Sequence, residues 1–321
     1  MSNLDTSPDV TLCHTEADDH AVTEVFEPRA VPLGGLRAVR VDRVMPQRGL
    51  PTVGAWCFLD SFGPHDTAMR VLPHPHTGLQ TVTWPLAGEI RHRDSLGSDV
   101  LVRPGQLNLM TAGRGVAHSE LSEPAGPLHG LQLWVALPAE RADMAPEFEQ
   151  HVSLPVFTAP GATGTVLLGT LGDTTSPATT HTPLVGADLT VTGSATLPLR
   201  PDHEHAVLVV SGTPTVAGVS LARNQLLYLG TGRTELRLSS TEAVRVLLLG
   251  GEPFPDELVM WWNFVGRSHD EIAAARADWE AGSARFGTVA GHNGDRIPAP
   301  DLPGIRLTPR RKTRESPFQT Q

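Results

Sequence analysis

Residues 72–88 read LPHPHTGLQTVTWPLAG and carry the pattern that decides the fold. The run TVTWPLAG is strand-like and contains Pro and Gly toward its end, which is typical of a β-strand that runs into a turn. His74 and His76 stand two positions apart just ahead of that run. Side chains i and i+2 of an extended strand point to the same face, so this H-x-H pair can direct two imidazoles at one point.

A second pair, His118 and Glu120, closes the stretch VRPGQLNLMTAGRGVAHSE at residues 102–120. Two such strands facing each other would bring together three imidazoles and one carboxylate. These ligand types suit iron, zinc, copper, nickel or manganese, and four protein ligands leave room for water or substrate on an octahedral ion. Ordinary barrel histidines are the alternative, but that alternative has to account for both pairs at once. The expected metal ligands are His74, His76, His118 and Glu120.

Glycine and proline punctuate the whole chain, with 31 and 28 residues among 321. They separate short runs rich in Val, Leu and Thr, which predicts an antiparallel β architecture. The formal net charge of −10 argues against generic nucleic-acid binding. The two cysteines, Cys13 and Cys57, are too few for a disulfide framework and favour a reducing compartment. No charged and apolar leader and no run of about 18 apolar residues is present, so we expect a soluble, cytoplasmic protein without membrane contact.

The second half of the chain repeats the strand pattern of the first, which indicates an internal duplication. PDHEHAVLVVSG at residues 201–212 parallels the first quoted stretch, and SLARNQLLYLGTG at 220–232 parallels the second. His203 and His205 form another H-x-H pair, but no H-x-E pair follows. The ligand count falls short of the four typical of closed sites, so we expect the second barrel to be free of metal.

One substantial helix is predicted over about residues 269–281. Ser268 and Glu271 form a capping box at its start, apolar residues then recur at helical spacing, and Gly282 is placed to end it. The predicted organisation is a disordered tail at 1–25, a metal-binding barrel at 26–140, a linker at 141–160, a degenerate barrel with the helix at 161–290, and an extended tail at 291–321.

The order of the motifs resembles the pirin family of the cupin superfamily from about Arg40 to about Gly282. HPHxG, TVT, HxDSxG, MTAGRGxxHSE and HGLQLWV occur in the family's order in the first half. The likeness weakens in the second half, where mainly a Gly-Glu-Pro element at residues 251–253 and the helix remain. The resemblance implies an all-β bicupin, that is, two cupin-type β-barrels with a C-terminal helix.

Gln80 departs from the family pattern, because many relatives carry Glu at this place and general cupins use that Glu as a ligand. Pirins take their carboxylate from the later H-S-E element, so the resemblance implies that Glu120 is the ligand and that Gln80 supports the site from behind. The HxDSxG motif contributes His92 and Asp94. These two side chains would share one face of a strand and could hold the ligands through hydrogen bonds, or anchor a loop.

The resemblance further implies quercetin 2,3-dioxygenase activity, in which a flavonol ring is opened by dioxygen with release of carbon monoxide. Glu120 would be the catalytic residue, accepting the flavonol proton. The expected cofactor is one divalent transition metal, Fe(II) first, with Mn, Co, Ni, Cu or Zn as alternatives. A regulatory protein that binds a transcription factor or a metabolic enzyme in a metal- and redox-dependent way is the rival class, and a degenerate cupin with a structural metal is the third. We expect a monomer whose partners are a flavonol-like molecule and dioxygen.

Overall fold

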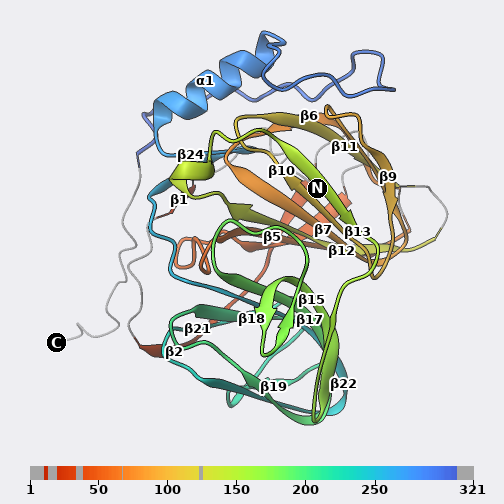
Figure 1. Ribbon diagram of the computed structural model, residues 1–321, viewed down its shortest axis with the longest axis vertical. Helices are drawn as coiled ribbons and strands as arrows, with labels where there is room; N and C mark the ends of the chain where they lie inside the picture. Colours follow the sequence, from red (N-terminus) through yellow and green to blue (C-terminus); the bar gives the residue numbers. More distant parts are fainter. Residues whose placement is uncertain (1–10, 14–19, 34–38, 67, 123–125, 309–321) are drawn as a thin grey trace.

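The computed structural model describes residues 11–13, 20–33, 39–66, 68–122 and 126–308. Over these residues the regular structure is β-strand, apart from one α-helix and the short 3₁₀ helix η1 (Ala139–Arg141). Two β-barrels lie one above the other, and the helix lies beyond the first barrel (Figure 1). The predicted all-β fold of two cupin-type barrels with a C-terminal helix is confirmed.

The first barrel consists of a seven-stranded and a four-stranded antiparallel sheet. The seven strands run in the order β13-β10-β7-β12-β5-β4-β3, and the four run β6-β11-β8-β9. Their bounds are β3 (Arg29–Leu33), β4 (Val39–Met45), β5 (Trp56–His65), β6 (Arg70–His76), β7 (Leu79–Ala87), β8 (Ile90–Asp94), β9 (Asp99–Val102), β10 (Leu107–Thr111), β11 (Val116–Leu121), β12 (Leu128–Ala136) and β13 (Glu147–His151).

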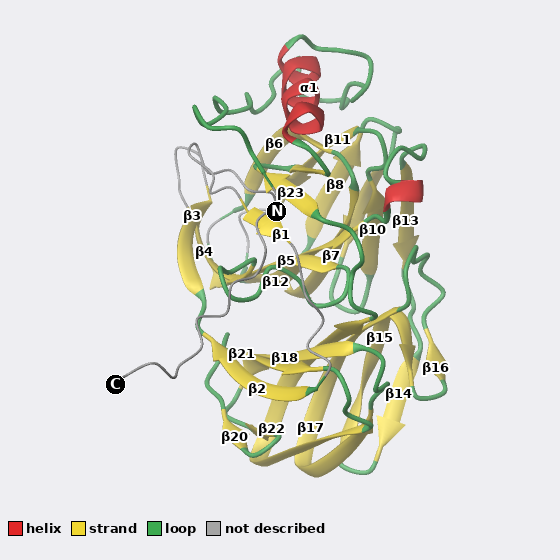
Figure 2. Cartoon of the chain, turned by 90° about the vertical axis from the view of Figure 1, so that its left-hand side faces the viewer, coloured by secondary structure: helices red, strands yellow, loops and turns green. Residues whose placement is uncertain are grey.

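The second barrel is built on a ten-stranded sheet whose main path runs β14-β15-β17-β22-β18-β21-β2. Its two longest strands, β17 and β22, pair along most of their length and turn the sheet on itself (Figure 2). The bounds are β2 (Ala21–Phe26), β14 (Val156–Ala159), β15 (Ala162–Leu171), β16 (Thr174–Thr175), β17 (Leu184–Pro198), β18 (Glu204–Ser211), β19 (Thr215–Val216), β20 (Val219–Ser220), β21 (Leu226–Gly230) and β22 (Glu235–Gly251).

A small third sheet joins β1 (Thr11–Cys13), β23 (Leu258–Trp261) and β24 (Phe264–Gly266), and the helix α1 (His269–Glu280) follows it. The predicted capping box is present: the backbone N–H of Glu271 donates to Ser268 Oγ at 3.2 Å. The helix buries Ile272 and Trp279, and Gly282 follows it with φ +65°. The described helix is too short and too polar to cross a membrane.

The predicted organisation grouped the helix with the residues of the second barrel, whereas the helix packs on the first barrel. Its apolar side chains join a cluster that contains Ala117 of β11 and Phe264 of β24. The segment after the helix returns to the same barrel, where the Ile297 N–H donates to Pro73 O at 2.8 Å. The C-terminal part of the chain therefore buttresses the strands β6 and β11 from outside (Figure 1).

Two further boundaries are corrected by strand pairing. Residues 21–25, predicted as disordered tail, lie in the edge strand β2 and pair with β21. An edge strand needs main-chain hydrogen bonds and only one buried side, so a polar sequence can form it. Residues 141–160, predicted as a linker, contain β13 of the first barrel and β14 of the second. The rest of the predicted N-terminal tail, apart from 11–13 and 20, and residues 309–321 lie outside the described residues.

The interiors of the two barrels are different in kind. In the first barrel, β7 and β12 turn Thr83 and Gln132 inward, where Thr83 meets Glu120 of β11. The outward faces of the same strands carry Val82 and Leu133, which pack against the sheet of the second barrel. In the second barrel, most inward positions are aliphatic, with His205 near the start of β18 as an exception. This apolar core includes Val207, Val209, Leu227, Leu229, Val246 and Leu248. The first barrel thus has a polar interior suited to chemistry, whereas the second has a packed core.

Candidate metal centre

The two predicted ligand pairs lie on neighbouring strands of the four-stranded sheet. β6 and β11 pair antiparallel, with His118 opposite His74. An irregularity between His118 and Glu120 shifts Glu120 opposite Val71. The three imidazoles and the carboxylate are buried, with exposed fractions of 0 to 1%. Strand alternation and register together therefore place all three histidines in the interior of the first barrel, as the spacing predicted.

The three imidazoles converge on one point. Each offers a ring nitrogen, and these nitrogens all lie within 4.8 Å of one another. His76 Nε2 lies 3.1 Å from His118 Nε2. His74 Nδ1 donates to Leu72 O at 2.8 Å, which leaves the lone pair on its Nε2. That Nε2 atom has no hydrogen-bond partner among the described residues. A buried imidazole nitrogen with a free lone pair and no hydrogen-bond partner is typical of a metal ligand without its ion.

Burial keeps these imidazoles neutral. Loss of solvation lowers the pKa of His74 to about 4. The same burial, together with the neighbouring His74 ring, holds the pKa of His76 and of His118 well below the ordinary value. A neutral imidazole has the lone pair that a divalent cation needs, whereas an imidazolium has none. The donor set therefore fits a divalent transition-metal ion at neutral pH.

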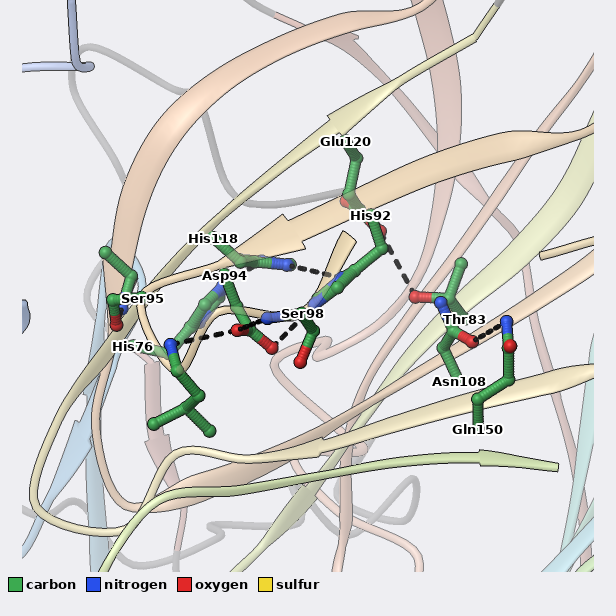
Figure 3. A network of polar contacts seen from close by, with 12 residues as sticks. His76, Thr83, His92, Asp94, Ser95, Ser98, Asn108, His118, Glu120 and Gln150 are labelled. Atoms are coloured by element: carbon green, nitrogen blue, oxygen red, sulfur yellow. Dashed lines mark hydrogen bonds and ion pairs between the residues drawn. The ribbon is translucent and has the colours of Figure 1, made fainter. Parts of the chain in front are cut away.

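Glu120 points into the same interior but stands apart from the group of three nitrogens (Figure 3). It lies opposite His92 in the pairing of β11 with β8, two positions after His118, so both side chains are on one face. Its Oε1 accepts a hydrogen bond from Thr83 Oγ1 at 3.1 Å. Thr83 comes from the opposite sheet, so the carboxylate spans the interior between the two walls of the barrel.

His92 and Asp94 form a chain of contacts behind His118 (Figure 3). His118 Nδ1 lies 3.4 Å from His92 Nδ1, and His92 Nε2 lies 3.1 Å from Asp94 Oδ2. Asp94 Oδ1 accepts from the backbone N–H groups of Leu96 and Ser98, each at 2.9 Å. Burial acts to raise the pKa of Asp94, but the hydrogen bonds from His92 and Ser98 outweigh it and hold this pKa below its ordinary value. The ionised Asp94 orients His92, which in turn orients His118.

Gln80 does not support the metal ligands, so that interpretation is wrong. Because Gln80 and Thr83 are three positions apart in β7, they face opposite sides of the sheet. The Gln80 amide Nε2 donates to Thr111 Oγ1 at 2.9 Å and to Thr179 O at 3.1 Å. The residue at this position therefore ties the outer face of the first barrel to the loop between β16 and β17 of the second barrel.

The barrel interior also has an aromatic wall beside the imidazoles. Phe58 stacks on Trp134 with ring centroids 4.0 Å apart, and the Trp134 ring meets His76 edge-on at 5.2 Å. Behind Phe58, the buried Arg43 and Asp60 form a two-point ion pair with both contacts at 2.9 Å. The Trp134 ring therefore borders the candidate metal position, and the Phe58 ring lies between Trp134 and Arg43, which is 4.6 Å from its centroid.

Thr83, Trp134 and the ion pair were not identified as site residues from the sequence. The signal that could have found them is register, since Thr83 pairs with Gln132 and Trp134 with Thr81 across β7 and β12. Trp84 packs between the barrels, where its Nε1 donates to Asp188 Oδ2 at 2.6 Å.

Comparison with known proteins gives a consistent assignment. The family model described as pirin matches residues 38–135, and the model of the pirin C-terminal cupin domain matches residues 184–287. A protein of Pseudomonas aeruginosa named as a candidate quercetin 2,3-dioxygenase is 45% identical, over 94% of this chain and 98% of that protein. A pirin-like protein of Caulobacter vibrioides is 35% identical, over 86% of this chain and 99% of that protein.

Solved structures agree with the sequence comparisons. The crystal structure of a quercetin 2,3-dioxygenase from Acinetobacter baumannii superposes with a TM-score of 0.85 at 40% identity, covering 89% of this chain and 98% of that one. A second quercetin 2,3-dioxygenase structure from the same organism gives a TM-score of 0.73 at 26% identity. Both barrels of the chain are covered by these matches.

Proposed function

Because the chain belongs to the pirin family, with relatives and solved structures that are named quercetin 2,3-dioxygenases, we propose that it is a metal-dependent dioxygenase of flavonols. The substrates are quercetin or a similar flavonol and dioxygen, and the products are a ring-opened ester and carbon monoxide. The observation that carries the proposal is the convergence of three buried, neutral imidazoles in a polar barrel. The regulatory alternative is not favoured, since the relative from Pseudomonas aeruginosa and the structures from Acinetobacter baumannii carry the name of the enzyme.

We assign His74, His76 and His118 as the ligands of one divalent ion and Glu120 as the fourth ligand. Fe(II) is the first candidate, with Mn, Co, Ni, Cu and Zn as the others. When bound, the ion supplies a Lewis acid for the flavonol oxygen and a path for electrons between the flavonol and dioxygen. The chain's own residues then have to bind the flavonol, exclude water and take its proton.

Glu120 is the group suited to take the proton of the flavonol hydroxyl. Thr83 Oγ1 carries a single proton and lies 3.1 Å from both Glu120 Oε1 and Gln132 Oε1. It donates to Glu120 while this carboxylate is ionised. Once Glu120 holds the substrate proton, the hydroxyl can donate to Gln132 instead and accept from Glu120. The interior therefore has a hydrogen-bond arrangement for each protonation state.

The aromatic wall and the His92–Asp94 chain have positioning roles. Trp134 borders His76 and gives the flavonol an aromatic neighbour beside the ion, while Phe58 stacks on Trp134 and holds its ring in place. Asp94 and His92 hold the His118 ring in the orientation that directs its Nε2 to the ion. The cluster around α1 packs on Ala117, next to His118 in β11, and supports the strand that carries this ligand.

The test is an aerobic assay that follows quercetin absorbance and carbon monoxide release. Protein stripped of metal is reconstituted with Fe, Mn, Co, Ni, Cu and Zn in turn, and metal loading is measured in each sample. We expect turnover with at least one metal and none in the stripped protein. Absence of turnover with every metal, despite full loading, would contradict the proposed activity.

A further inference from the structure

A second group of metal-ligating side chains lies at the mouth of the second barrel. Asp202 and His203 precede β18, and Glu252 directly follows β22. β18 and β22 pair antiparallel with Glu204 opposite Gly251, so one step beyond this pair His203 faces Glu252. Ligand atoms of Asp202, His203 and Glu252 all lie within 4.8 Å of one another.

His203 is buried without a hydrogen bond. Its exposed fraction is 3%, and neither Nδ1 nor Nε2 has a partner among the described residues. Burying an imidazole without any hydrogen bond is costly. A metal ion bound to one of its nitrogens would offset that cost. His203 and His205 together line a cavity of about 250 Å³, whose other walls include Leu171, Val185 and Leu199. Burial lowers the pKa of His203, which keeps the ring neutral and its lone pair available.

The charges around His203 favour a cation. Asp202 and Glu252 bring two negative charges, and Arg200 returns one positive charge through two hydrogen bonds to Asp202, from Nε to Oδ1 at 3.1 Å and from Nη2 to Oδ2 at 2.6 Å. Both side chains of this ion pair are exposed to solvent, so the pair contributes little to stability and holds Asp202 weakly. A carboxylate also has lone pairs on two oxygens and can bind an ion while it keeps one contact with Arg200.

The backbone fixes both sides of the group. The His203 N–H donates to Arg200 O at 3.1 Å, and the Glu252 N–H donates to Pro183 O at 3.2 Å. Gly54 of the first barrel touches this corner so tightly that a Cβ on it would lie 2.7 Å from Gly251 Cα. The ligand-bearing main chain is therefore in place before any ion arrives, which lowers the entropic cost of binding.

We propose that Asp202, His203 and Glu252 bind a divalent transition-metal ion at the mouth of the second barrel, separate from the centre at His74, His76 and His118. This replaces the expectation of a metal-free second barrel. The carboxylates come from residues outside the H-x-E spacing, so a search for that pattern misses them. One imidazole and two carboxylates suit Zn²⁺ with water in the remaining positions. The site does not depend on the proposed dioxygenase activity.

The test measures Zn²⁺ binding by equilibrium dialysis and elemental analysis on the full chain. His76→Ala serves as the background, because it removes the first centre and leaves the second to be counted alone. In this background we expect one equivalent of Zn²⁺. Adding Glu252→Gln should weaken it at least about 100-fold, since even the loss of a partner outside the ligand set costs about 10- to 100-fold. His203→Ala should have the same effect.

Glu242→Gln is the matched control, since Glu242 is an exposed acid of the same barrel outside the ligand group. It should leave Zn²⁺ binding unchanged. If His76→Ala does not fold, the count is made in the otherwise wild-type chain, where Glu252→Gln should lower it from two equivalents to one. Unchanged affinity in Glu252→Gln, or absence of this equivalent from the unsubstituted protein, would overturn the proposal.

Discussion

At the scale of single residues, the candidate centre depends on imidazoles that stay neutral. Burial lowers the pKa of His74 to about 4, and its Nδ1–H is held by Leu72 O. Both effects leave Nε2 as the atom that can bind the ion. The spacing of His74 and His76 in the sequence was enough to predict that they share a face. That His118 lies directly opposite His74 could not be read from spacing, because register depends on the pairing of β6 with β11.

Glu120→Gln is expected to separate metal binding from turnover. Gln keeps a neutral oxygen donor of similar size, so the ion can remain bound, but it cannot accept the flavonol proton. Loss of a general base costs about 10²- to 10⁴-fold in rate. Elemental analysis should show unchanged metal content, while kcat for quercetin falls within that range. Equal kcat in the variant and the wild type would rule out a proton-accepting role for Glu120.

Thr83→Val is expected to lower kcat by removing the hydroxyl that holds Glu120. A hydrogen bond to a charged group contributes about 1.5–3 kcal/mol, which corresponds to roughly 10- to 100-fold in rate if it acts fully in the transition state. Thr83→Ser restores the hydroxyl and should recover most of the activity, whereas a packing role would respond to the lost methyl group instead. If Val and Ser variants are equally impaired, Thr83 acts through packing alone.

At the scale of elements, the helix illustrates what local sequence can predict. Its capping box, apolar spacing and terminal glycine are local signals, and its observed bounds agree with the predicted ones to within a residue. Its place on the first barrel was not predicted, because packing partners distant in sequence leave no local signal. The helix packs near Ala117, which lies about 150 residues earlier in the chain, on the other side of the second barrel in sequence.

The edge strand β2 was missed for a related reason. Only Phe26 of this strand is buried, so the strand needs no alternation of apolar and polar residues. It is held by main-chain pairing with β21 and by Arg233 Nη2, which donates to Val22 O at 2.9 Å. Such contacts depend on a sheet edge that exists only in the folded barrel. Side-chain patterns therefore predict buried strands better than edge strands.

Ser268→Ala is expected to destabilise the protein by about 1 kcal/mol, which is typical for the loss of a helix N-cap. Ser268 Oγ accepts from the Glu271 N–H, which has no partner within the helix. Urea unfolding should show a lower midpoint at an unchanged slope. Ser268→Asp retains an acceptor at the cap and should stay close to the wild type. A midpoint in Ser268→Ala equal to that of the wild type would show that this cap contributes nothing.

At the scale of the whole molecule, the duplicated fold has divided its tasks. The first barrel has a polar interior that holds the imidazoles, whereas the second is filled mostly with aliphatic side chains. The two share a continuous apolar core formed by the outer face of the seven-stranded sheet and the sheet of the second barrel. The missing H-x-E pair led to the expectation of a metal-free second barrel. The apolar filling behind it could not be predicted from ligand spacing.

The stability of the metal-free protein is expected to fall as the pH is lowered from about 6.5 to about 4. Burial lowers the pKa of His74, His129 and His205 to about 4 from 6.5. Between these values the unfolded chain binds more protons than the folded protein, so acidification favours unfolding. Fully buried His74 alone accounts for up to about 3 kcal/mol. Asp99 and Asp202, with pKa values near 2, add their loss only at lower pH.

Chemical unfolding of chelator-treated protein at a series of pH values would measure this dependence. The free energy of unfolding should be flat above about pH 7 and should decline steadily below it. A stability that stays constant from pH 7 to pH 4.5 would contradict the assignment of neutral buried imidazoles.

The most direct test of the account is metal content and carbon monoxide release measured together in His76→Ala, beside the wild type and His151→Ala. His151 is a histidine of the same barrel that pairs with Glu149 on the outer side of β13, so its loss controls for the removal of an imidazole. The account predicts that His76→Ala loses one equivalent of metal and all quercetin-dependent carbon monoxide release, while His151→Ala keeps both. Retention of the full metal content and of carbon monoxide release by folded His76→Ala would contradict a catalytic metal held by His74, His76 and His118.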